Sequence, residues 1–272
     1  MKRVILMTVV CLLAAAGFTN AQAGELSGTV DLTFQSKYIW RGFDVYGDMS
    51  AIQTSVNLDL FGTGFGVSMM GHMANSSGYD DGGASLVNGE RWDYYAYYGG
   101  KLFEDELYAT NWRMGYMYYN FPDSSGHSRG SADLSELHWI LSWPNAIPVK
   151  GLVPTYCLVK LWPQNGGSLQ RETSGFAHIF MLDYGLTVPG ILPDTDEQVL
   201  RLHSELVFND GVHPAGGNAD HDWSNIVFGV ETDFDLGNNM SLTPGLYQQI
   251  SMDDSVNDED ETWVNLSLKY KF

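Results

Sequence analysis

The chain ends in the segment TWVNLSLKYKF, residues 262–272, in which apolar and polar side chains alternate almost without exception. Side chains in a β-strand change face at every residue, so this segment has one apolar face and one polar face. A strand of this length with two such faces fits a wall between lipid and a wet lumen. We therefore interpret it as the strand that closes a barrel, with these side chains directed to lipid: Val264, Leu266, Leu268, Tyr270 and Phe272.

The opposite end of the chain indicates export. Lys2 and Arg3 precede an apolar run from Val4 to Phe18, and Ala21-Gln22-Ala23 then has the small-residue pattern of a cleavage site. We expect residues 1–23 to be a signal peptide and residues 24–272 to form one barrel domain. No later apolar run reaches the length of about 18 residues that a membrane helix needs. Export without a helical anchor leaves a soluble protein or a barrel.

Composition favours the barrel, because residues 24–272 are poor in Lys and Arg, rich in Gly, Tyr, Trp and Asn, and only weakly hydrophobic on average, as expected when lipid-facing and lumen-facing residues alternate. Removing Lys2 and Arg3 from the 14 basic residues leaves 12 against 33 acidic ones, a net formal charge of −21. A charge of this sign attracts cations and excludes nucleic acid as an expected partner. Without the signal peptide Cys157 is the single cysteine, so no intrachain disulfide is expected. A soluble β-sandwich of similar strand content is the alternative fold.

Twelve segments show strand-like alternation and are long enough to cross a bilayer at a tilt. They lie near residues 25–36, 49–61, 64–75, 92–103, 106–121, 133–143, 153–162, 175–188, 198–209, 223–235, 240–251 and 262–272. The fold class we predict is therefore an all-β, antiparallel up-and-down transmembrane barrel of twelve strands.

The connections between these segments alternate in length, as they do in outer-membrane barrels. Gly62-Thr63, Glu104-Asp105 and Gly237-Asn238-Asn239 are tight turns, whereas residues 76–91, 122–132, 163–174, 210–222 and 252–261 are long and polar. Residues 144–152 and 189–198 are long for inner turns, but their prolines argue for connection rather than strand. With both termini in the periplasm, every long connection lies on the outer side.

Aromatic residues cluster near the predicted strand ends, where amphipathic rings meet both lipid and water. The expected girdle residues are Trp92, Tyr94, Tyr116, Tyr118, Trp139, Trp143, Trp162 and Trp263. Within the strands, charges should fall on the inner face, because a charge against lipid at mid-depth costs on the order of 2–4 kcal/mol. Phe228 and Val230 should accordingly meet lipid, with Glu231 and Asp233 turned inward.

The first connection contains the most distinctive motif, SKYIWRG at residues 36–42, followed by an early glutamine, Gln53, in the next strand. This S-x-Y-x-x-R-G pattern, on Ser36, Tyr38, Arg41 and Gly42, resembles the start of the TorF family of porin-type outer-membrane barrels. GYMYY at residues 115–119 is similar to a strand that these proteins often carry, so the likeness covers roughly the first half of the chain.

The resemblance implies an outer-membrane location and a channel, although Phe43-Asp44 departs from the small polar pair that the family commonly has. The residues themselves suggest a role. Arg41 at the rim would pair with an inward carboxylate and fix the loop, with Gly42 permitting a sharp reversal. The alternative is a surface arginine beside a turn glycine.

Two polar loops contain metal-ligand residue types. The acidic loop holds Asp253, Asp254, Asp258, Glu259, Asp260 and Glu261, and residues 211–222 hold His213, Asp220, His221 and Asp222. The acidic loop lacks the glycine and spacing of a calcium loop. It is interpreted as a solvated loop, or alternatively as a cation-favouring vestibule or a divalent-ion bridge to lipopolysaccharide. We predict no metal site and no cofactor.

An enzymatic site is not predicted. Twelve-stranded outer-membrane phospholipases use a His and a Ser two residues apart on one lipid-facing strand, and none of the seven histidines here is followed two positions later by Ser.

The predicted lumen-facing polar set is Asp31, Gln53, Asn57, Asp59, Asp93, Lys101, Asn111, Arg113, Lys160, Asp183, Arg201, Glu205, Glu231, Asp233 and Lys269. Mixed charges at this density predict either a transverse field lining a narrow pore or a salt-bridged plug. Barrels of about 8 strands are filled by side chains and those of about 16 to 18 hold an open channel, so twelve strands leave the choice open.

The sequence therefore predicts an outer-membrane barrel of a Gram-negative-type envelope that acts as a narrow passive channel for small neutral or cationic solutes. The alternative is a non-conducting structural or surface-interaction barrel whose acidic loops bind cations, lipopolysaccharide or a partner. Expected partners are outer-membrane lipids, lipopolysaccharide and the barrel-assembly machinery.

Overall fold

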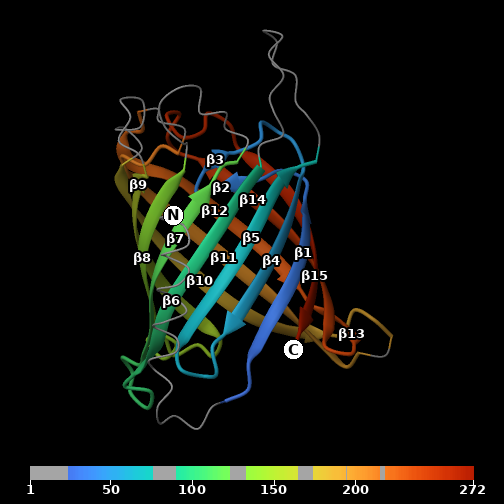
Figure 1. Cartoon of the computed structure of the whole chain (residues 1–272). Coiled ribbons are helices and arrows are strands. Elements are labelled where there is room, and N and C mark those ends of the chain that lie inside the picture. The colour runs from blue at the N-terminus through green and yellow to red at the C-terminus, as the bar shows by residue number, and fades with distance from the viewer. Residues whose placement is uncertain (1–23, 76–89, 123–132, 165–173, 194, 215–217) are drawn as a thin grey trace.

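The computed structural model describes residues 24–75, 90–122, 133–164, 174–193, 195–214 and 218–272. Fifteen strands are present in this part of the chain (Figure 1). They are β1 (Ser27–Gln35), β2 (Ile39–Trp40), β3 (Phe43–Asp44), β4 (Ala51–Asp59), β5 (Phe65–Ala74), β6 (Glu90–Leu102), β7 (Thr110–Asn120), β8 (Leu134–Ser142), β9 (Leu152–Pro163), β10 (Gly175–Pro189), β11 (Glu197–Asp210), β12 (His221–Thr232), β13 (Phe234–Gly237), β14 (Met240–Ser251) and β15 (Glu261–Lys271).

The large sheet is a closed antiparallel barrel. Each strand pairs with its neighbours in sequence, and β1 pairs with β15 from Thr29↔Lys271 to Gln35↔Asn265, which joins the first strand to the last. Strands β12 and β13 both pair with β14 and act as one interrupted strand, so the wall has twelve strands. The predicted fold class and strand number are confirmed, and β15 is the strand that pairs with β1.

The barrel has a turn end and a loop end (Figure 1). The short connections and the C-terminus lie at the turn end, and the tight turns contain left-handed residues such as Gly62 (φ 66°) and Asn238 (φ 52°). The described long connections, residues 36–50 and 252–260, lie at the other end, which is the outer side in barrels of this kind. In the described ranges no helix is long and apolar enough to cross a membrane.

The outer face of the wall is apolar. On the closing strand, Leu266 is 45% exposed and Phe272 is 45% exposed, while the alternate residues Asn265 and Ser267 face inward. Most predicted girdle aromatics lie on this outer face, but Trp263 does not. Its ring is 7% exposed and stacks on Tyr247 inside the barrel, because Trp263 shares the inward face of β15 with Asn265.

The inner face is not uniformly polar. A buried apolar cluster, which we call the inner apolar cluster, lines the barrel from β6 to β11 and consists of Tyr95, Met117, Tyr119, Leu134, Cys157, Val159, Leu161, Ala177, Ile179 and Val207, with Val212 from the following loop. Val159 and Leu161 have no exposed surface, so other parts of the chain inside the barrel cover them.

This cluster corrects one prediction. Lys160 was expected in the lumen, but β9 turns Val159 and Leu161 inward and Lys160 outward, opposite Leu137 and Phe176. Its ammonium nitrogen lies 4.4 Å from the centre of the Phe176 ring. The strand is apolar on both faces, so the charge alone could not identify the lumen side. A lysine near the edge of the lipid belt can extend its ammonium toward water.

Candidate channel constriction

The segment between β1 and β4 forms a small hairpin. Strands β2 and β3 pair through Trp40↔Phe43, which leaves Arg41 and Gly42 as a two-residue turn. Their φ angles are 52° and 94°. Two successive positive φ values define the tight turn that matches the twist of a hairpin. Glycine adopts this geometry without strain, whereas arginine needs other contacts to hold it there.

Arg41 has those contacts on the β8 wall. Its guanidinium donates two hydrogen bonds to the Glu136 carboxylate, with N–O distances of 2.7 and 2.8 Å. Glu136 has no exposed side-chain surface, and it also accepts from the Tyr119 hydroxyl at 2.8 Å and contacts His138 Nδ1 at 3.1 Å. A buried two-pronged pair of this kind fixes orientation as well as charge. Arg41 is therefore an internal anchor and not a surface arginine.

Gly42 is held on the other side of the barrel. Its carbonyl accepts hydrogen bonds from Gln249 Nε2 on β14 at 3.0 Å and from Asn257 Nδ2 at 3.2 Å. A Cβ atom at this position would lie 2.7 Å from Asn225 Oδ1 on β12 and 2.8 Å from Val256 Cγ1. The backbone of the turn therefore approaches β12 and β14 so closely that only glycine fits.

The base of the hairpin packs around a second arginine. Arg91 on β6 pairs with Asp93 at 2.9 Å and donates to the Tyr38 hydroxyl. The Arg91 guanidinium carbon also lies 5.2 Å from the centres of the Trp40 and Tyr119 rings. Cation–π contacts of this length are strongest where water is excluded, as it is at this buried site.

The hairpin crosses the lumen. Arg41 contacts β8 and the adjacent Gly42 contacts β14, and around the wall four strands separate β8 from β14 in one direction and six in the other. Neighbouring residues of one turn thus contact nearly opposite walls. We call residues 36–50 the crossing segment. It covers part of the inner apolar cluster, against which Trp40 packs.

Toward the turn end the lumen contains a pocket with charged residues in its lining. The pocket has a volume of about 530 Å³ and is lined by Asp183, Arg201, His203, Glu231 and Tyr247 among others. Arg201 Nε lies 2.7 Å from Glu231, His203 Nδ1 lies 2.6 Å from Asp183, and the Tyr247 hydroxyl donates to Glu231 at 2.8 Å. Glu205 and Asp233 also belong to this side, so carboxylates outnumber the basic groups.

The predicted lumen set divides into three groups. Strand pairing places on the inward side Asp31, Gln53, Asn57, Asp59, Lys101, Asn111, Arg113, Asp183, Arg201, Glu205, Glu231 and Lys269, with Asp233 bonded to Arg201 just beyond β12. Asp93 also points inward but is only 1% exposed and is enclosed beside Arg91. Lys160 faces outward.

The motif residues Ser36, Tyr38, Arg41 and Gly42 all hold the crossing segment in place. Ser36 continues the β1–β15 seam, since its backbone nitrogen donates to the Val264 carbonyl and its hydroxyl accepts from the Val264 nitrogen, each at 2.9 Å. Tyr38 is buried, and its ring stacks on His72 at 5.1 Å. Sequence reasoning missed Glu136 and Arg91, which are the partners of this motif. The signal that could have identified them is that each is a charged residue at an inward-facing position of its strand.

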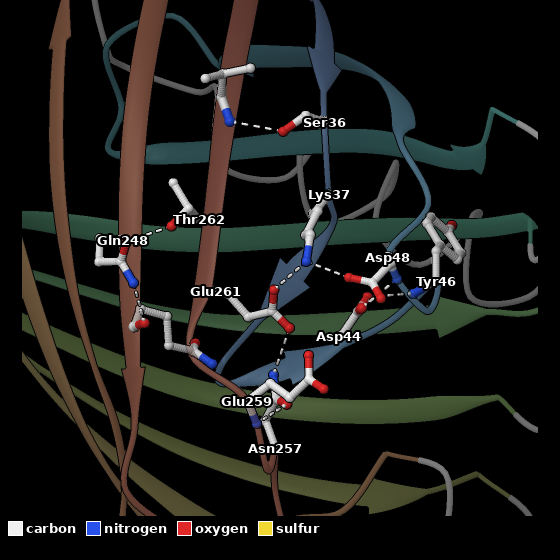
Figure 2. A network of polar contacts seen from close by, with 12 residues as sticks. Ser36, Lys37, Asp44, Tyr46, Asp48, Gln248, Asn257, Glu259, Glu261 and Thr262 are labelled. Carbon is white, nitrogen blue, oxygen red and sulfur yellow. Dashed lines mark hydrogen bonds and ion pairs between the residues drawn. The ribbon is translucent and has the colours of Figure 1, made fainter.

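Sequence reasoning also missed an ion-pair group at the loop end of the barrel (Figure 2). Lys37 lies between Asp48 and Glu261, with its ammonium 2.7 Å from Glu261. Asp44, Asp48 and Glu261 approach within 4.8 Å of one another, the one such acidic group in the described ranges. The hydrogen bonds to Asp48 and Glu261 raise the pKa of Lys37, so this lysine stays charged. It is the counter-ion of the group.

Comparison with known proteins identifies the fold of this chain. No protein-family model matches the chain, and no curated protein matches its sequence. Among solved structures, the KdgM porin is 13% identical and covers 90% of this chain and 99% of its own, with a TM-score of 0.51. An outer-membrane channel from Pseudomonas putida F1 is 13% identical over 94% of this chain and 98% of its own, with a TM-score of 0.52. This chain has a porin-like outer-membrane β-barrel fold.

An enzyme shares this fold as well. LpxR from Salmonella typhimurium, a lipid A deacylase barrel, is 9% identical over 90% of this chain and 100% of its own, with a TM-score of 0.52. The likeness to porins therefore describes architecture, and function has to be argued from the lumen of this chain.

Proposed function

We propose that this protein is a narrow passive channel of the outer membrane for small neutral or cationic solutes. The observation that carries the proposal is the division of the lumen by depth. The turn-end half contains a pocket of about 530 Å³ whose lining includes Asp183, Arg201 and Glu231, and the loop-end half is narrowed by the crossing segment. A channel narrowed by an inward-folded segment is expected to have a charged cavity next to the constriction. A segment that served only as a structural plug would not need such a cavity.

The charges of the turn-end half support the preference for cations. Asp183, Glu205 and Glu231 lie on β10 to β12, where Arg201 pairs with Glu231 and His203 lies beside Asp183 and Glu205. Five strands separate β6, which carries Lys101, from β12 in either direction, so Lys101 stands on the wall opposite Glu231. Charges in the wall of a narrow pore act on a permeating ion more strongly than charges on exposed loops.

The test is ion selectivity in planar bilayers. The folded protein should conduct, and its reversal potential in a salt gradient should shift toward the cation equilibrium value. Glu205→Gln removes an inward carboxylate and should reduce that shift even at 1 M salt, where the Debye length is about 3 Å. The control Asp254→Asn lies in the exposed outer loop and should change selectivity at low salt only. Folded protein that never conducts would overturn the proposal.

One observation favours the alternative, a non-conducting barrel. Gln249, Asn225 and Glu136, which surround the Arg41–Gly42 turn, have no exposed surface, so the turn is packed against both walls. A barrel sealed in this way would present its acidic loops to cations, lipopolysaccharide or a protein partner. The same bilayer experiment separates the two functions.

We also propose that the protein is not an enzyme and that it belongs with TorF-type barrels. His178 faces the membrane, but its Nδ1 lies 2.7 Å from the Tyr156 hydroxyl and has no serine beside it in the described ranges. The motif on Ser36, Tyr38, Arg41 and Gly42 supports the family proposal, because all four positions have defined structural roles here. Lys160 at the outer edge of the belt would contact lipopolysaccharide, and the terminal strand would engage the barrel-assembly machinery.

A further inference from the structure

Beside the crossing segment, the two sides of the barrel differ in their exposure to solvent. Inward residues on β1 and β4, namely Thr33, Gln35, Gln53 and Ser55, are partly exposed to solvent. On the facing wall Glu136, Val159 and Leu161 are fully covered. We call the β1–β4 side the polar lane. Any solvent path past the crossing segment runs along this lane, because on the other walls Glu136, Asn225 and Gln249 have no exposed surface and the inner apolar cluster is packed.

The polar lane reaches the outer mouth at the Lys37 ion-pair group. Lys37 follows β1 by two residues, Glu261 begins β15, and Asp48 precedes β4, so the three residues come from the elements that border the lane (Figure 2). Glu261 is 2% exposed, and its other carboxylate oxygen accepts from Asn257 Nδ2 at 3.2 Å. Asp44 accepts a hydrogen bond from the Tyr46 backbone nitrogen at 3.1 Å. Glu261 and Asp44 therefore have fixed positions, whereas the Asp48 side chain is 66% exposed.

We propose that Lys37 sets the charge selectivity of this outer mouth as a tethered counter-ion. With its ammonium in place, Lys37 cancels one of three neighbouring carboxylates and excludes mobile cations from the space between them. Without it, the mouth of the lane would carry three unneutralised carboxylates. This inference rests on the proposed channel function and names the residue that limits its preference for cations.

Reversal potentials of two opposite variants test the assignment. Lys37→Met should raise the cation-to-anion permeability ratio about twofold or more at 0.1 M salt, where the Debye length is about 10 Å. Asp48→Asn removes one of the three carboxylates near Lys37, which makes the outer mouth less negative, and should lower the cation-to-anion permeability ratio. If loss of the Lys37–Asp48 pair only loosened the crossing segment, both variants would change conductance in the same direction. Opposite shifts in the permeability ratio therefore identify a charge effect.

A matched control removes the same formal charge elsewhere. Lys150 lies exposed in the β8–β9 turn, and Lys150→Met should leave the permeability ratio unchanged. Lys37→Arg keeps the positive charge and should behave like the parent protein. A conducting parent with identical ratios in Lys37→Met and Asp48→Asn would overturn this inference alone. A folded parent and variants that never conduct would overturn the channel proposal together with it.

Discussion

At the scale of single residues, the pair formed by Arg41 and Glu136 carries most of the explanation. An arginine at φ 52° is in a conformation that side chains rarely adopt, and strained residues of this kind are found where surrounding contacts over-determine them. Here the contacts are a buried carboxylate and the ring of Trp40, which in turn packs edge-on against Tyr119. The sequence motif suggested that Arg41 would find an inward carboxylate. It did not identify Glu136, because a 95-residue separation leaves no local signal.

Replacing Arg41 with alanine should destabilise the protein strongly. The change leaves the fully buried Glu136 carboxylate without its guanidinium, and breaking a buried pair in this way costs about 3–5 kcal/mol. The free energy of unfolding in lipid vesicles, measured by urea titration, gives the loss. Arg113→Ala is the control, since Arg113 is exposed and lies over the Tyr97 ring at 4.4 Å, a contact worth about 0.5–1 kcal/mol. Equal losses in the two variants would show that the Arg41 pair is not an anchor.

At the scale of strands, alternation predicts well where each strand lies in the chain, and less well which of its side chains point into the barrel. The twelve wall strands were found because lipid requires an apolar outer face and sheet geometry makes that face recur at every second residue. The closing strand shows this most clearly, with Leu266 outward and Ser267 inward. On β9 the rule failed, because a lumen filled by protein also accepts apolar residues. Val159 and Leu161 inside are then as apolar as Leu158 outside.

Neighbouring substitutions on the closing strand test its register. Leu266→Arg places a charge against lipid near the middle of β15 and should lower the free energy of unfolding by about 2–4 kcal/mol. Ser267→Arg points inward beside Asp31, to which Ser267 donates at 2.6 Å, and should cost less. Folding titrations into vesicles measure both. Equal losses, or a larger loss for Ser267→Arg, would mean that the faces of β15 are reversed.

At the scale of the whole molecule, the barrel was predictable and its interior was not. Strand count, closure and the loop end follow from periodicity and turn residues, which are local properties of the chain. The crossing segment depends on contacts between Gly42 and Gln249, and between Lys37 and Glu261, which are separated by more than 200 residues. No alternation pattern encodes them. The mixed charges of the lumen predicted either a transverse field across an open pore or a salt-bridged plug. The structure has a buried pair, Arg41 with Glu136, that fixes the crossing segment, and a partly exposed pair, Arg201 with Glu231, nearer the turn end.

The central claim is that the crossing segment, and not the barrel wall, limits passage through this protein. The measurement that tests it most directly is single-channel conductance of a variant in which residues 38–46 are replaced by a short Gly-Ser linker. The variant should also carry Glu136→Gln, so that no buried carboxylate is left unpaired. We expect it to fold and to conduct several times more current than the parent, because a twelve-stranded wall without an internal segment encloses a wider lumen. Equal conductance in the folded variant and the parent would contradict the account.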